Sequence, residues 1–201
     1  LRGSGLSRTG SMRTWLITGA LLAYVGAAYW WAFFVLPAEP ATTLWPGSSG
    51  VPIPMDQGLV AVAEETFFRG FLLFGLLRVW ASAQHVWARA VAVSATAFGV
   101  LHLAQALAGS SVGTAAMSVI IATSLGVWVG VLVLLGGSVW PAVLVHAATN
   151  SIVVVGAAGL TDYQPGILSY AAALAAELPL LLAAFVLIHR HDSRHSCSEQ
   201  A

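Results

Sequence analysis

The sequence predicts an all-α fold, a polytopic membrane bundle of about six transmembrane helices, from three observations. Of its 201 residues, 58% are hydrophobic and only 8% are charged, whereas a soluble domain carries about 25% charged residues. Between Arg89 and Asp162 the chain contains no Asp, Glu, Lys or Arg, so at least two spans lie there. Six mostly apolar runs have the length of about 20 residues that crosses a bilayer: 14–36, 57–78, 90–108, 113–135, 139–160 and 166–189.

The ends of these runs support the assignment. The uncharged stretch from Thr14 to Leu36 exceeds the roughly 7–15 apolar residues of a signal peptide, which indicates a retained first span. Residues 136–138, Gly-Gly-Ser, end the fourth run, and Pro141 suits the first turn of the fifth helix. The connection between these two spans is therefore expected to be tight.

The arginines predict the orientation of the chain. They precede span one, flank the loop after span two and follow span six: Arg2, Arg8, Arg13, Arg78, Arg89, Arg190 and Arg194. With six spans, all three positions fall on one side, which the positive-inside rule makes cytoplasmic. Both termini are thus predicted to be cytoplasmic, in the bacterial cytoplasmic membrane. The Pro-rich loop that contains Glu39, Pro46 and Asp56 is expected on the opposite side.

The remaining features predict one domain and exclude one class of function. We expect a disordered extension at 1–13, a membrane domain at 14–190 and a polar tail at 191–201. The formal net charge is zero and the arginines are dispersed, which excludes the clustered basic surface of a nucleic-acid binder. The pair Gly126 and Gly130 permits close helix approach, for which ordinary packing is the simplest interpretation.

Span two carries the first group of ionisable residues. Glu65 and Arg69 have the i,i+4 spacing of a helical ion pair, with the acid on the N-terminal side. Glu64 is turned about 100° from Glu65 and has phenylalanines one to two turns away, so its charge has no local partner. An ionisable group at the bilayer centre costs at least about 2.5 kcal/mol and therefore indicates a function or a partner. Glu64 is a candidate general base, whereas the alternative is a structural network in which both glutamates share Arg69.

Spans three and five carry the other polar groups. Phe98 and His102 share a helix face, as do His146 and Asn150, by i,i+4 spacing. Each histidine or asparagine alone is also explained by hydrogen bonding between helices. Counted at 1.5 Å per residue, Glu64, His102 and Asn150 lie at similar depths and His146 about one turn deeper, so the groups can converge.

Together the three motifs, E-E-x-x-x-R, F-x-x-x-H and H-x-x-x-N, resemble the hallmarks of the CPBP family, the CAAX proteases and bacteriocin-processing enzymes, over roughly residues 57–155. The resemblance implies intramembrane peptide hydrolysis. Glu64 would activate water, His102 would hold and polarise it, and His146 with Asn150 would form the oxyanion site. Glu65, Arg69 and Phe98 would support these residues, and no cofactor is required.

Three alternatives remain open from the sequence. Glu64, His102 and His146 also make a three-ligand zinc set with Glu65 as the base, although no H-E-x-x-H pair is present. A transporter or a non-catalytic membrane scaffold would use buried acids and histidines differently. For a protease, the expected partners are the lipid bilayer and a membrane-anchored protein or peptide substrate.

Overall fold

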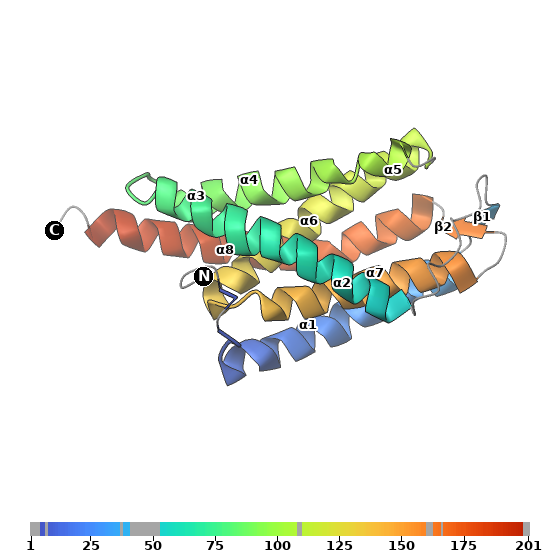
Figure 1. The fold of residues 1–201 in the computed structure, drawn as a ribbon, viewed down its shortest axis with the longest axis horizontal. Coiled ribbons are helices and arrows are strands. Elements are labelled where there is room, and N and C mark those ends of the chain that lie inside the picture. Colours follow the sequence, from blue (N-terminus) through green and yellow to red (C-terminus); the bar gives the residue numbers. More distant parts are fainter. Residues whose placement is uncertain are drawn as a thin grey trace.

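The computed structural model is a bundle of long helices that run along one axis (Figure 1). It describes residues 5–6, 8–36, 38–40, 53–107, 110–159, 163–165 and 167–198. Within these described residues each predicted span lies mostly on helix, which confirms the all-α membrane bundle. In chain order the helices are α1 (Met12–Trp30) with the π-helix η1 (Trp31–Val35); α2 (Ile53–Glu65), η2 (Thr66–Leu73) and α3 (Phe74–Val79); α4 (Val86–Leu101) and α5 (Ala104–Leu107); α6 (Val112–Gly136); α7 (Trp140–Gly159); and α8 (Ile167–Ser198).

The helices differ in how well they suit a lipid environment. Within the described residues, four helical segments are long and apolar enough to cross a membrane: Met12–Val35, Val86–Leu107, Val112–Gly136 and Ile167–Ser193. Trp140–Val155 is a shorter apolar helix. The α2–η2–α3 segment has the length of a span but carries Glu64, Glu65 and Arg69 in its middle. The segment that holds the ionisable motif is therefore the one least suited to contact lipid on all sides.

The two ends of the bundle are distinct. At one end, β1 (Ala38–Pro40) pairs antiparallel with β2 (Tyr163–Pro165), and Ala38 lies opposite Pro165. The start of α1, the end of α8 and the α3–α4 connection lie at the other end (Figure 1), and the side of the membrane that this end faces stays a prediction. Residues 41–52, which form most of the predicted Pro-rich loop, lie outside the described residues.

Close approach of α4 to α6 forms the centre of the bundle. A Cβ added at Gly126 would lie 3.0 Å from the Cα of Ala95, and one at Gly130 would lie 3.6 Å from Val91. Both glycines therefore pack against α4 within the chain. On α4 itself, Gly99 faces α6 so closely that a Cβ there would lie 2.8 Å from the carbonyl oxygen of Val119 and would overlap Thr123 Oγ1.

The connection between α6 and α7 is as tight as predicted. Gly137 ends α6 with a φ of 61°, in the left-handed region that favours glycine. Ser138 Oγ donates to the carbonyl oxygen of Arg8 at 2.6 Å, and Trp140 Nε1 donates to that of Leu6 at 3.2 Å. The described part of the N-terminal segment thus contacts this turn. The predicted boundaries at 13 and 190 stay predictions.

Helix α8 continues to Ser198, beyond the predicted end of span six at residue 189, and reaches the start of α4. The first residues of α4 have no side-chain cap of their own, and His85 before them has a φ of 56°. The carboxylate of Asp192 instead accepts from the backbone N–H groups of Trp87 and Ala88, both at 3.3 Å. A carboxylate at a helix N-terminus satisfies free N–H groups and complements the helix dipole. The His191 ring stacks on Trp87 next to this cap, with centroids 3.5 Å apart.

Mutation of a glycine can test the close packing of α4 against α6. We expect Gly99→Ala to lower the stability of the purified protein by about 1–3 kcal/mol, because the methyl group has no room against α6. Gly75→Ala is the matched control, since a Cβ there meets nothing within 4 Å. Thermal unfolding in detergent micelles measures both variants. Equal stability of the two would contradict the close packing of α4 on α6.

Candidate active site

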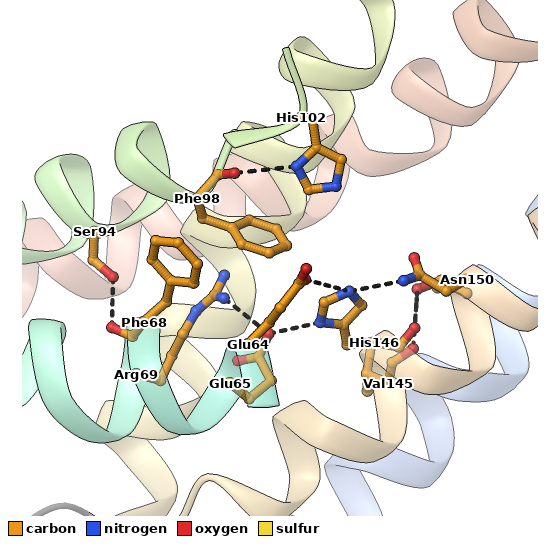
Figure 2. Close-up of polar contacts among 11 residues, drawn as sticks. Glu64, Glu65, Phe68, Arg69, Ser94, Phe98, His102, Val145, His146 and Asn150 are labelled. Carbon is orange, nitrogen blue, oxygen red and sulfur yellow. Dashed lines mark hydrogen bonds and ion pairs between the residues drawn. The ribbon is translucent and has the colours of Figure 1, made fainter. Parts of the chain in front are cut away.

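The three predicted motifs meet in the middle of the bundle. Glu64 and Glu65 come from the last turn of α2, Phe98 and His102 from the end of α4, and His146 from α7 (Figure 2). The π-helix η2 begins directly after Glu65. Such wider turns occur frequently at functional sites. The convergence expected from helix depth is therefore present in the structure.

Glu65 and Arg69 form the ion pair that their spacing predicts. Arg69 Nη1 donates to Glu65 Oε1 at 2.8 Å, and both side chains are fully buried. The same oxygen accepts from His146 Nδ1 at 2.9 Å. One carboxylate oxygen of α2 therefore holds both the arginine one turn further along and the histidine of α7.

The ring of Phe98 contacts Arg69 and both histidines of the site. The guanidinium carbon of Arg69 lies 4.4 Å from the centre of the Phe98 ring, which is the geometry of a cation–π contact. The same ring meets His102 and His146 edge to face, with centroids 5.0 and 5.3 Å away. Phe98 thus covers Arg69 and sets the spacing of the two histidines.

His146 uses both ring nitrogens. Its Nδ1–H donates to Glu65, which directs Nε2 toward Asn150 Nδ2 at 3.0 Å and Glu64 Oε2 at 3.5 Å. Neutral His146 presents its Nε2 lone pair to the Asn150 amide, whereas the protonated ring presents an N–H there. Glu65 therefore orients the imidazole, because the bond at one ring nitrogen fixes the direction of the other.

The two adjacent glutamates have different surroundings. The Glu64 side chain is 26% exposed and that of Glu65 is 1% exposed. Glu64 lines a cavity of about 280 Å³ together with His102, His146 and Asn150. Its carboxyl group points into the space between the two histidines (Figure 2). Glu64 is thus the half-buried acid at the cavity, and Glu65 is the fully buried acid behind it.

His102 is held in place from its own helix. Its Nδ1 lies 3.1 Å from the carbonyl oxygen of Phe98, one turn earlier, so this nitrogen carries the proton in the neutral ring. The ring lines the same cavity as Glu64. Its Nε2 is therefore directed away from the backbone and is the nitrogen suited to a bound water or substrate.

Two polar contacts near the site were not predicted from the sequence. Ser94 Oγ donates to the carbonyl oxygen of Phe68 inside η2 at 2.8 Å, and Tyr29 donates its hydroxyl proton to Glu177 Oε1 at 2.5 Å. Tyr29 also lines the cavity. A signal for the second contact existed, because Glu177 is the only charged residue in the run 166–189 and a lone acid in a span requires a partner.

The zinc alternative needs Glu64, His102 and His146 around one ion. Among the residues that the structure describes, no three His, Cys, Asp or Glu side chains are grouped closely enough to hold a metal. Glu64 and His146 meet, and His102 lines the same cavity with its Nδ1 on the Phe98 carbonyl and its Nε2 unbonded to the backbone. The three side chains line one cavity without forming a closed ligand cluster in the described residues. Whether the reaction needs a metal stays a prediction.

Comparison with known protein families gives one match. The family described as Type II CAAX prenyl endopeptidase, Rce1-like, matches residues 46–152, which is slightly more than half of the chain and includes all three motifs. No curated protein and no solved structure matches the chain.

Mutation can test whether the buried ion pair between Glu65 and Arg69 stabilises the site. We expect Arg69→Met or Glu65→Gln alone to lower stability by about 3–5 kcal/mol, because each disrupts a buried charge pair. The double variant should lose less than the sum of the two, since it leaves no unpaired charge. Yield and thermal unfolding of the three purified variants in detergent give this comparison. Additive losses would show that the two side chains do not interact.

Proposed function

Because the chain belongs to the Rce1-like family of type II CAAX prenyl endopeptidases, we propose that it hydrolyses peptide bonds inside the membrane with Glu64 as the base that activates water. The observation that carries this assignment is the difference between the two glutamates. Glu65 is buried and paired with Arg69, whereas Glu64 faces the cavity and has no arginine bonded to it in the described residues. A general base must reach the proton that it removes, and of the two carboxylates only Glu64 opens to the cavity.

The first step uses Glu64 and His102. A water bound in the cavity lies within reach of the Glu64 carboxylate, and His102 Nε2 holds it by a second hydrogen bond. Glu64 removes one proton as the water oxygen attacks the carbonyl carbon of the scissile bond. The C–O bond forms, the carbonyl π electrons move to oxygen, and Glu64 carries the proton.

The second step uses His146 and Asn150. The oxyanion of the tetrahedral intermediate accepts from Asn150 Nδ2–H and from Nε2–H of His146, which enters the reaction protonated and keeps that proton throughout. The two nitrogens lie 3.0 Å apart in the structure. Donors fixed in advance stabilise developing charge without reorganisation. When the C–N bond breaks, Glu64 returns its proton to the leaving amine. The enzyme ends in its starting state.

Glu65, Arg69 and Phe98 are positioning residues in this proposal. Glu65 Oε1 fixes the imidazole of His146, Arg69 balances the charge of Glu65, and Phe98 covers the guanidinium. The family gives the reaction class, and the surroundings of each side chain support its role.

We expect Glu64→Gln to abolish cleavage, with a loss of at least about 100-fold, because the amide cannot take a proton from water. Asp56→Asn is the matched control, since it makes the same chemical change two turns earlier on α2, outside the cavity lining. Cleavage of a membrane-peptide library by purified wild type and both variants measures the effect. Full activity of Glu64→Gln would remove Glu64 from the mechanism.

A zinc chelator added to the same reactions separates the two mechanisms. The proposal expects wild-type cleavage to resist the chelator. Chelator-sensitive cleavage that zinc restores would instead support a metal-dependent reaction. Unfolding temperatures of the three proteins show that a lost activity is not a lost fold.

A further inference from the structure

We propose that two helices outside the matched family segment select what the active-site cavity binds. The selecting surface is an aromatic wall, which consists of Tyr29, Phe33 and Tyr170. Glu177 is the positioning residue of this wall, because it holds the hydroxyl group of Tyr29 away from the cavity. The wall then favours a substrate that places an apolar side chain in the cavity. This inference rests on the proposed function, since it assigns the substrate chemistry of the same cavity.

The cavity has lining residues from two parts of the chain. The reactive groups, Glu64 among them, come from residues 46–152, the segment that matches the family. The aromatic wall comes from outside this segment: Tyr29 from α1, Phe33 from η1 and Tyr170 from α8. The matched segment therefore supplies the chemistry, and the first and last helices of the chain supply a separate surface of the same cavity.

The three rings of the aromatic wall pack in series. The ring centroids of Tyr29 and Phe33 lie 5.7 Å apart, with planes tilted by 49°. Those of Phe33 and Tyr170 also lie 5.7 Å apart, in a T-shaped pair with planes at 86°. Tilted and edge-to-face contacts of this kind are favourable for aromatic pairs. The wall therefore joins α1 and η1 to α8 and presents a fixed surface to the cavity.

Glu177 is fully buried on α8, about two turns after Tyr170. It accepts a hydrogen bond from the Tyr29 hydroxyl group at 2.5 Å, and it does not line the cavity. The Tyr29 ring therefore lies between the carboxyl group and the cavity, with its hydroxyl group directed to the carboxyl group. A phenol has one proton to donate. Tyr29 bonded to Glu177 thus offers ring carbons, and not a donor, to a substrate.

A second contact between the same helices shows that joining them does not require an acid. The hydroxyl group of Tyr24 on α1 donates to the carbonyl oxygen of Ala176 on α8 at 2.8 Å, one residue before Glu177. Tyr24 does not line the cavity. A backbone carbonyl is therefore sufficient to hold a tyrosine of α1 on α8. An acid inside a span is costly and indicates a function, which for Glu177 is the orientation of the one tyrosine that faces the cavity.

Binding of two peptides tests the aromatic wall without depending on catalysis. The probes are fluorescent, myristoylated alanine peptides that carry either Leu or Ser at one central position. Fluorescence anisotropy measures their affinity for the Glu64→Gln protein in lipid nanodiscs. We expect this protein to bind the Leu peptide at least about fivefold more tightly than the Ser peptide, which corresponds to about 1 kcal/mol. Partition into lipid is the same for every variant, so a change in this ratio reports on the cavity.

Variants of the pair, made in the same background, then separate positioning from helix packing. Glu177→Leu removes the acceptor of the Tyr29 hydroxyl group, which becomes free to donate into the cavity, so the ratio should fall below about twofold. Adding Tyr29→Phe to Glu177→Leu removes that hydroxyl group and should restore the ratio. Glu177→Gln keeps an acceptor oxygen and should keep the ratio. Tyr24→Phe is the matched control and should also keep it.

A further variant, Phe33→Ser, changes the wall without touching Glu177 and should lower the ratio even if Glu177→Leu does not fold. Equal affinity of the Glu64→Gln protein for the two peptides would overturn the inference. So would an unchanged ratio in Glu177→Leu or Phe33→Ser, a double variant that stays low, or an equal fall in Tyr24→Phe. Retained cleavage by Glu64→Gln would instead contradict the proposed function, and the ratio would still be measured from the initial anisotropy.

Discussion

A single buried oxygen atom, Oε1 of Glu65, organises the centre of this protein. It accepts one hydrogen bond from Arg69 on η2 and another from His146 on α7. Two segments 81 residues apart in the chain are therefore joined at a fully buried point. The direction of the His146 ring, and through it the position of Asn150 relative to Glu64, follows from this one bond.

Such a charge inside a membrane protein is tolerated only where its surroundings are shaped for it. Arg69 lies against the face of Phe98, and Gly126 of α6 faces its Nη2, where a Cβ would lie at 3.2 Å. The glycine pattern that appeared to be ordinary helix packing thus also leaves room for the guanidinium. Ser94 satisfies the carbonyl of Phe68 within the π-helix. The same few side chains therefore pack around the guanidinium, satisfy a backbone carbonyl of the π-helix and balance the buried charge.

Much of the fold and of the site could be predicted from the sequence, because the bilayer imposes strong rules. The lengths of the apolar runs give the helices, and the spacing of Glu65 and Arg69 gives their ion pair, since both follow from local helix geometry. The bond from His146 to Glu65 could not be predicted, because it depends on the rotation of α7 relative to α2. For the same reason the pairing of Tyr29 with Glu177 was missed, although Glu177 alone in its span was a visible signal.

Helix α4 links the C-terminal helix to the cavity. Asp192 of the C-terminal helix binds its first backbone N–H groups, and the histidine after its last turn faces the cavity. Its 16 residues form a rod of about 24 Å between these points. Because a helix of this length moves nearly as a rigid body, a displacement of the C-terminal segment at the arginine-rich end would be transmitted to His102 at the cavity wall. The C-terminal part of α8 is thus coupled through α4 to the cavity, although it lies at the other end of the bundle (Figure 1).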